Sequence, residues 1–327
     1  MTTRRARLVA LFVFFVASLF SQRDALAKKP VELGKFDVGH AVFAMNLTEA
    51  GGAPGVPPVP RPVDVQVWYP AQKENFENSP LAVYRSRFYG VTLIPAKWDP
   101  LSWELKSQVA REGAPVDAES EAFPIIVFSH GSTSSPIDFT HNFEHLASHG
   151  YIVAAPWHTR TNQDDVRANF LNTQNGGPRF MPCPDGRLIG CVDAVIKTLA
   201  INRVRDVKGV LDTLPALFGS RADINRVGLM GHSAGSITAI LAAGGSLAFG
   251  VAADPRVSAV LTMGMITDDV IDQTDTENVT VPALFFAGAL DASTPPATSL
   301  RVYNEISSVD KAHIILSNTV HRTFSSG

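Results

Sequence analysis

Short, uniformly apolar segments recur along the chain from residue 123 onward, and segments with helical spacing of apolar residues lie between several of them. Uninterrupted apolar runs of this length are typical of strands in a parallel sheet that is covered on both faces. The expected strands comprise residues 124–128, 151–155, 227–230, 257–263, 283–287 and 313–316. The expected helices comprise residues 136–149, 192–217 and 234–243. This alternation predicts an α/β fold.

The first of these helices has recognisable ends. Ser135 is its expected N-cap, and Pro136 fits the first turn. Asp138 is placed to accept a hydrogen bond from a backbone N–H of that turn. Gly150 is expected to end the helix, because glycine readily adopts the backbone conformation that follows a helix C-terminus.

The N-terminal part of the chain has a different pattern. Residues 36–45 and 63–68 are expected strands, and the Gly/Pro-rich residues 51–62 between them predict a loop, so an antiparallel hairpin is expected. Residues 71–122 show no clear period and predict an irregular excursion over one edge of the fold. Since no internal repeat is present, we expect one domain over residues 28–327, with a mostly parallel central sheet, the N-terminal antiparallel hairpin and helices on both faces.

Residues 1–27 have the layout of a secretory signal peptide. Arg4, Arg5 and Arg7 precede the apolar residues 8–20, and small residues suited to cleavage follow at 25–27. The apolar run is too short to cross the roughly 30 Å hydrocarbon core of a bilayer, so a permanent anchor is the less favoured alternative. We expect export to the periplasm or the cell exterior by the general secretory route, although the paired arginines hint at the twin-arginine route.

The composition narrows the class of partner. The chain is 45% hydrophobic and 18% charged with a net charge of −3, which becomes more negative when the basic leader is removed. Basic residues are scattered and form no stripe with aromatic residues, so no nucleic-acid partner is expected. We expect a globular monomer with no stable membrane span in the mature chain.

Two cysteines, Cys183 and Cys191, are present. In an exported protein, two thiols this close in sequence most simply form a local disulfide. Two buried free thiols are the alternative.

The sequence Gly231-His232-Ser233-Ala234-Gly235 lies directly between an expected strand and an expected helix, and it fits the pattern GxSxG. In a nucleophile elbow, the glycines permit a tight strand-to-helix turn that raises the serine hydroxyl above the sheet. A glycine-rich turn with an ordinary solvent-exposed serine is the alternative. Ser233 is the predicted nucleophile.

A serine nucleophile needs a histidine that accepts its proton and a carboxylate that orients this histidine. In this kind of fold the three residues follow the chain order serine, acid, histidine. Asp291 follows the apolar residues 282–286, and His321 follows residues 312–316. Both are expected on loops at the carboxyl ends of strands, where open α/β sheets hold their active sites. They are the predicted acid and base.

Other residues compete for these two roles. His313 is the alternative base, but it lies inside an apolar strand pattern that favours a packed histidine. Asp268, Asp269 and Asp272 follow the expected strand at 257–263 and are alternative acids. Asp291 is favoured because its offset from the preceding apolar run is short.

The sequence Ser129-His130-Gly131-Ser132 directly follows the expected strand at 124–128. A backbone N–H from this loop and one from the residue after the nucleophile form the oxyanion hole in such sites. The amides of Ser132 and Ala234 are therefore the predicted donors. His130 is expected to shape the turn by hydrogen bonding, and an acid–base role is the alternative.

These residues resemble the α/β-hydrolase superfamily. Within it, they resemble the group of plasma-type platelet-activating-factor acetylhydrolases and dienelactone-hydrolase-like proteins, which borders the bacterial polyester hydrolases. The matching stretches are residues 61–70, 123–131, 146–156, 205–206, 231–235 and 320–321. The resemblance implies an α/β-hydrolase fold and hydrolysis of carboxylic esters through an acyl-enzyme by Ser233 and His321, without a cofactor or a metal. It also implies an ester substrate, either a small molecule or a lipid or polymer.

The chain departs from this group in two respects. Members of the group can carry the acid after the strand that corresponds to residues 257–263, but residues 260–264 contain no carboxylate. Only six residues follow His321, which leaves little room for a covering C-terminal helix. Neither departure removes the nucleophile, but each leaves the acyl and alcohol groups of the substrate open.

A zinc peptidase is one alternative function. The sequence from His141 through Glu144 to His145 fits the HxxEH motif, and His149 continues the histidine stripe. However, the apolar stripe of the same helix, which comprises Phe139, Phe143 and Leu146, directs these histidines towards solvent. Zinc catalysis is therefore not favoured over adventitious surface binding.

A non-catalytic binding protein on a hydrolase scaffold is a second alternative, and the intact serine, acid and histidine argue against it.

Two segments are candidates for the walls of the substrate pocket. The aromatic residues between Tyr84 and Trp103 and the loop between Trp157 and Cys191 are candidate walls, but aromatic residues at such spacing are as often ordinary core. Short-chain esters, acetylated lipids and aromatic polyesters are the candidate substrates.

Overall fold

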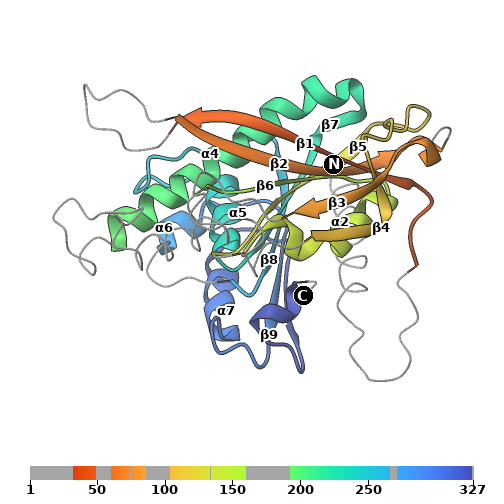
Figure 1. Ribbon diagram of the computed structural model, residues 1–327. Coiled ribbons are helices and arrows are strands. Elements are labelled where there is room, and N and C mark those ends of the chain that lie inside the picture. Colours follow the sequence, from red (N-terminus) through yellow and green to blue (C-terminus); the bar gives the residue numbers. More distant parts are fainter. Residues whose placement is uncertain are drawn as a thin grey trace, which may run out of the picture.

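The computed structural model describes residues 32–48, 60–73, 76–85, 104–132, 134–159, 192–265 and 271–325, without the side chains of residues 192–199. The leader, both cysteines, Asp268, Asp269 and the aromatic residues within residues 86–103 lie outside the described residues. Within them, ten strands form one sheet in the order β10-β9-β8-β7-β5-β6-β2-β1-β4-β3 (Figure 1).

Parallel strands make up one side of the sheet. They are β5 (Phe123–Ser129), β6 (Ile152–Pro156), β7 (Ala222–His232), β8 (Val257–Met263), β9 (Ala283–Gly288) and β10 (Lys311–Leu316). All residues of β6 and β9 are buried, which accounts for their uninterrupted apolar sequence. All six were predicted, although β7 begins five residues before the apolar run at 227–230.

The predicted antiparallel hairpin is also present. Strands β1 (Asp37–Thr48) and β2 (Pro60–Ala71) pair along their whole length, and β2 joins the parallel strands through β6. Two further strands, β3 (Leu81–Arg85) and β4 (Glu104–Glu112), extend this side. The prediction that residues 71–122 are irregular is therefore wrong. Strand β4 has no clear sequence signal because its two buried residues, Ser107 and Ala110, are small and do not form a hydrophobic period.

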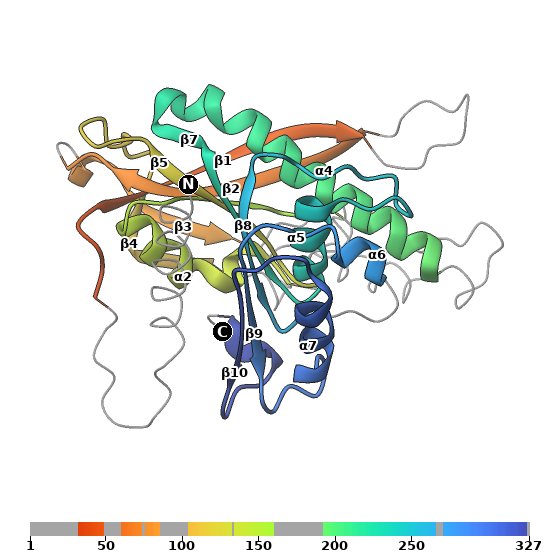
Figure 2. The same ribbon diagram turned by 180° about the vertical axis from the view of Figure 1, so that it is seen from behind.

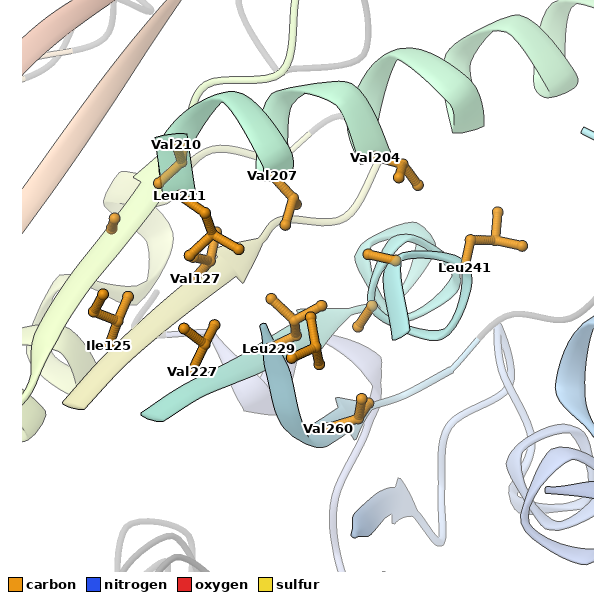
Figure 3. Close-up of a cluster of buried hydrophobic side chains, with 14 of the residues drawn as sticks. Ile125, Val127, Val204, Val207, Val210, Leu211, Val227, Leu229, Leu241 and Val260 are labelled. Carbon is orange, nitrogen blue, oxygen red and sulfur yellow. The ribbon is translucent and has the colours of Figure 1, made fainter. Parts of the chain in front are cut away.

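Helices cover both faces, as predicted. One face carries α4 (Val192–Phe218), α5 (Ala234–Gly244), the single turn α6 (Gln273–Thr276) and α7 (Pro296–Glu305), and the other carries α2 (Thr140–Ser148) (Figure 2). Figure 3 shows the core beneath α4, where Val204, Val207 and Leu211 face alternate residues of the central strands such as Val127 and Leu229. None of the described helices is long and apolar enough to cross a membrane.

Short 3-10 turns complete the described structure: η1 (Phe76–Asn78), η3 (Pro136–Phe139), η4 (Gly219–Arg221) and η5 (His321–Phe324). The helix predicted from residue 136 therefore starts as η3 and continues as α2. Its predicted ends are present, because Asp138 accepts a hydrogen bond from the backbone N–H of Ser135 at 2.9 Å and Gly150 has a φ of +94°.

Candidate active site

Ser233 lies at the sharp turn between β7 and α5. Its φ of 55° is in the left-handed region, which serine rarely adopts, and its N–H donates to the carbonyl of Met263 at 2.9 Å. The flanking glycines are required by space: a Cβ on Gly235 would overlap the carbonyl oxygen of Ser129, and one on Gly231 would overlap the backbone of Gly235. This geometry is that of a nucleophile elbow.

Asp291 and His321 lie side by side beyond the carboxyl ends of β9 and β10. The Nδ1 of His321 donates to Oδ2 of Asp291 at 2.8 Å. The other carboxylate oxygen accepts the backbone N–H groups of Ser293 at 2.9 Å and Thr294 at 2.8 Å. Because the bond to Asp291 fixes the proton of a neutral His321 on Nδ1, the Nε2 atom is left to accept a proton.

Thr294 connects the members of this pair. Its hydroxyl donates to Oδ2 of Asp291 at 2.6 Å and lies 2.9 Å from Nδ1 of His321. Burial acts to raise the pKa of Asp291, but the hydrogen bonds from Thr294 and His321 outweigh it, so the pKa lies below its ordinary value. The carboxylate is therefore ionised at neutral pH and can stabilise a protonated His321.

Gly264, directly after β8, provides the space for this pair. Its φ is +51°, and a Cβ there would lie 3.1 Å from Nδ1 of His321 and 3.2 Å from both Oδ2 of Asp291 and Oγ1 of Thr294. The segment that lacks a carboxylate thus ends in a glycine packed against the Asp291–His321 pair.

His232, the residue before the serine, contacts the histidine of the pair. Its Nε2–H donates to the carbonyl oxygen of His321 at 3.1 Å, and the two ring centroids are 4.7 Å apart. Burial, and then the proximity of His321, lower the pKa of His232 to about 4. His232 is therefore neutral at neutral pH and acts as a packing partner of His321.

The loop after β5 lies against the elbow. A Cβ on Gly131 would lie 3.1 Å from Cβ of Ser233. His130 is fully buried, with Nδ1 2.7 Å from the carbonyl oxygen of Gly131 and Nε2 accepting the N–H of His158 at 3.1 Å. Burial and the charge of Arg203 hold its pKa well below the ordinary value. These contacts fit the predicted turn-shaping role of His130. The predicted amide donor residue Ser132 is exposed at the end of this loop.

The alternative base and acid have other contacts. His313 lies 2.9 Å from the hydroxyl of Ser299 through Nε2 and packs beside Tyr303. Asp272 caps α6, where it accepts the hydroxyl of Thr274 at 2.6 Å and the N–H of Asp275 at 3.1 Å. Each of these side chains has a local structural role, while Asp268 and Asp269 lie outside the described residues.

The HxxEH helix is not arranged as a zinc site. Glu144 is buried and accepts the hydroxyls of Tyr84 at 2.7 Å and Ser107 at 2.6 Å, while His141 is exposed. The expectation that all these histidines face solvent is wrong for His145, which is 5% exposed. The ring of His145 packs on that of His149, with centroids 4.4 Å apart, and the segment before β1 is hydrogen-bonded to Ser148 at the same end of α2. Within the part of the chain that the structure describes, no cluster of three ligands for a metal occurs.

Tyr84, the first residue of the predicted aromatic excursion, belongs to the core. It is 1% exposed, and its hydroxyl accepts the indole N–H of Trp68 at 2.9 Å. It is therefore not a wall of a substrate pocket at the elbow, whereas the aromatic residues after it lie outside the described residues.

Sequence reasoning missed Gly264 and Thr294. Thr294 follows an aspartate by three residues, a spacing at which side-chain oxygens often accept backbone N–H groups, and this signal was available. The contacts of Gly264 bring together the ends of three separate strands, so no local sequence pattern predicts them.

Comparisons with known proteins agree with this architecture. The family model described as Chlorophyllase matches residues 114–174. The chain is 25% identical over 216 residues to chlorophyllase-1, chloroplastic, of Citrus unshiu, covering 62% of this chain and 56% of the relative. It is 28% identical over 190 residues to platelet-activating factor acetylhydrolase of Cavia porcellus, covering 51% and 39%. The chain spans about half the length of the curated relatives it matches.

A solved structure supports the same fold. The ferulic acid esterase from Streptomyces cinnamoneus matches with a TM-score of 0.57 and 23% identity, covering 89% of this chain and 76% of that chain. The predicted fold and the predicted resemblance are thereby confirmed. The chain has the α/β-hydrolase fold, and its likenesses in sequence and structure lie in the esterase group of that fold.

Proposed function

We propose that this protein hydrolyses carboxylic esters through an acyl-enzyme, with Ser233 as nucleophile, His321 as base and Asp291 as acid. The observations that carry the proposal are a serine with a φ of 55° at a strand-to-helix elbow and a histidine whose Nδ1 is 2.8 Å from a buried carboxylate. The ring of this histidine lies 4.7 Å from the ring of His232, the residue before the serine. The names of the acetylhydrolase and ferulic acid esterase relatives support the same reaction class.

The reaction follows from these positions. The Oγ of Ser233 attacks the ester carbonyl carbon while Nε2 of His321 takes its proton, and ionised Asp291 stabilises the imidazolium. The negative charge that develops on the carbonyl oxygen is accepted by the N–H groups of Ser132 and Ala234. The tetrahedral intermediate then expels the alcohol, which receives the proton from His321. Water repeats these steps on the acyl-enzyme and releases the acid.

The substrate we propose is an ester of a small molecule, a lipid or a polymer, without a cofactor or metal. We also propose, from the sequence of residues 1–27, that the protein is exported, and from the spacing of Cys183 and Cys191 that it carries a local disulfide. A panel of short-chain, acetylated-lipid and aromatic esters on the mature protein would identify the acyl group.

The test is hydrolysis of p-nitrophenyl butyrate by the wild type and by Ser233→Ala. We expect the variant to fold and to lose on the order of 10⁴-fold or more in kcat, as a triad does without its nucleophile. The control is Ser258→Ala, which removes an exposed serine at the opposite end of β8 and should retain kcat. Activity of the wild type should survive a chelator. A Ser233→Ala protein as active as the wild type would overturn the proposal.

A further inference from the structure

A buried cluster of charged and polar side chains lies behind the loop of residues 129–132. It comprises Arg61 from β2, His158 after β6, and Arg203 and Asp206 from α4, and none of these side chains is more than 4% exposed. Burying ionised groups is costly, and packed apolar residues are often at least as stabilising. The cluster therefore calls for a reason other than stability.

One series of contacts leads from β2 to this loop. Arg61 donates to Oδ1 of Asp206 at 2.5 Å, and Nδ1 of His158 lies 2.7 Å from Oδ2 of the same carboxylate. Because the carboxylate accepts the proton on Nδ1, the Nε2 of neutral His158 accepts the hydroxyl of Ser129 at 2.8 Å. The backbone N–H of His158 also donates to His130.

Arg203 holds the loop directly. Its Nη1 donates to the carbonyl oxygen of His130 at 2.5 Å and approaches Oγ of Ser129 at 3.4 Å, and its Nη2 approaches the carbonyl oxygen of Gly131 at 3.4 Å. The ring of His130 lies 2.7 Å from the same Gly131 oxygen. The carbonyl groups of two successive residues are thus drawn into the cluster.

This arrangement determines where the next amide points. In a planar trans peptide, the C=O of one residue and the N–H of the next point in opposite directions. Since the Gly131 carbonyl points into the cluster, the N–H of Ser132 points away from it. Gly131 itself packs against Ser233, so the loop lies beside the nucleophile.

The net charge of the cluster also favours the stabilisation of an oxyanion beside the loop. Burial and the two arginines hold the pKa of His158 well below its ordinary value, so this residue is neutral. Two arginines and one carboxylate then leave a net positive charge behind the loop. A fixed positive charge near a developing oxyanion lowers the energy of the transition state without reorganisation.

We propose that Arg203 is a positioning residue that, together with His158 and Asp206, orients the Gly131–Ser132 peptide so that its N–H stabilises the oxyanion of ester hydrolysis. The inference rests on the proposed function. It assigns the cluster to the transition state rather than to substrate binding, so its loss should lower kcat and leave KM nearly unchanged.

The test uses Arg203→Met and Arg203→Lys in the full protein, with active-site titration so that kcat refers to folded enzyme. Methionine removes the contacts with the carbonyl groups of His130 and Gly131. We expect kcat to fall about 100-fold, the scale of the loss of one oxyanion-hole donor. Lysine keeps the charge but has one nitrogen for two carbonyls, and about a tenfold loss is expected. The inhibition constant of an alkyl trifluoromethyl ketone should rise by the same factors, because the adduct of this inhibitor with the serine carries the oxyanion.

Arg256→Met is the matched control. Arg256 is ion-paired with Asp254 and Asp212 and does not contact the loop, so its loss should lower stability and leave kcat and inhibitor affinity unchanged. If the methionine variant does not fold, the lysine variant decides. The inference is overturned by a folded Arg203 variant whose kcat is within threefold of wild type, including one in which only KM is raised. A wild type without esterase activity would instead overturn the proposed function.

Discussion

Gly264→Ala tests whether the space beside the Asp291–His321 pair matters for catalysis. Gly264 has a φ of +51°, and the new Cβ would lie 3.1 Å from Nδ1 of His321 and 3.2 Å from Oδ2 of Asp291. The substitution therefore adds one methyl group at the hydrogen bond that orients the base, without removing any polar group of the site.

Two effects set the magnitude. The left-handed backbone costs an alanine roughly 1 kcal/mol relative to glycine, so unfolding should become easier by about that amount. The Cβ contacts are about 0.3 Å shorter than ordinary van der Waals contact, so His321 or Asp291 must move by a similar distance. Since a 1 Å misplacement costs about 100-fold, a shift of this size together with a distorted hydrogen bond should lower kcat by about tenfold.

Gly219→Ala separates the two effects. Gly219 has a φ of +54°, and its Cβ would meet no atom within 4 Å, so this variant carries the backbone strain without the contact. Both variants should lose about 1 kcal/mol in urea unfolding, but only Gly264→Ala should lose kcat on p-nitrophenyl butyrate. Equal kcat for the two variants would refute the reasoning.

Three further predictions concern the acid, its hydroxyl partner and the cysteines. Asp291→Asn should fold, because an asparagine oxygen can still accept the N–H groups of Ser293 and Thr294, but its amide would impose the wrong tautomer on His321 and lower kcat by up to about 10⁴-fold. Asp268→Asn, Asp269→Asn and Asp272→Asn should each stay within about tenfold of the wild type, and a collapse of kcat in one of them with Asp291→Asn active would relocate the acid. Thr294→Val should lower kcat and, by removing a hydrogen bond to ionised Asp291, cost about 1 kcal/mol in unfolding free energy at pH 7. The pKa of Asp291 is lower in the folded than in the unfolded protein, so this stabilisation is present above the unfolded pKa of about 4 and is lost as pH falls through the folded pKa. The difference in unfolding free energy between Thr294→Val and the wild type should therefore shrink in acid. A difference that does not change with pH would contradict this prediction. Finally, intact-mass measurement after alkylation without reductant should find Cys183 and Cys191 unmodified, whereas two alkylated thiols would contradict the disulfide.

The parallel strands were predictable because strands buried on both faces need apolar residues at nearly every position. Strand β4 was not, since its two buried residues are small and its two larger apolar residues, Leu105 and Val109, are only half-buried among polar ones. Helix α7 was also missed, because Ser299 and Val302 are its only buried residues and two side chains do not define a hydrophobic period.

The residues of the candidate site also differ in whether the sequence could predict them. Ser233, Asp291 and His321 could be proposed because each follows a recognisable strand and the three have a fixed order in the chain. Arg203 could not, because its role depends on contact with a loop more than 70 residues earlier. A sequence shows that a residue is an arginine on a helix but not which carbonyl it will meet.

The position of His321 relative to the sheet has a consequence for inactivation. It follows β10, the edge strand, whose residues are only half-buried or exposed, and which pairs with β9 alone among the described strands. Ser233 instead lies between the buried C-terminal end of β7 and α5, in which eight of eleven residues are buried. Segments with little buried surface open locally at a lower free energy than the whole molecule.

Detachment of β10 would therefore separate His321, the proposed base, from Ser233, the proposed nucleophile, while the central sheet stays folded. Under mild heat or urea, activity should disappear before the bulk spectroscopic transition, and amides of β10 should exchange with solvent ahead of those of β7. With the proposed catalytic residues, we expect this outer strand to govern the catalytic lifetime, so that securing it to β9 prolongs activity without changing the stability of the core.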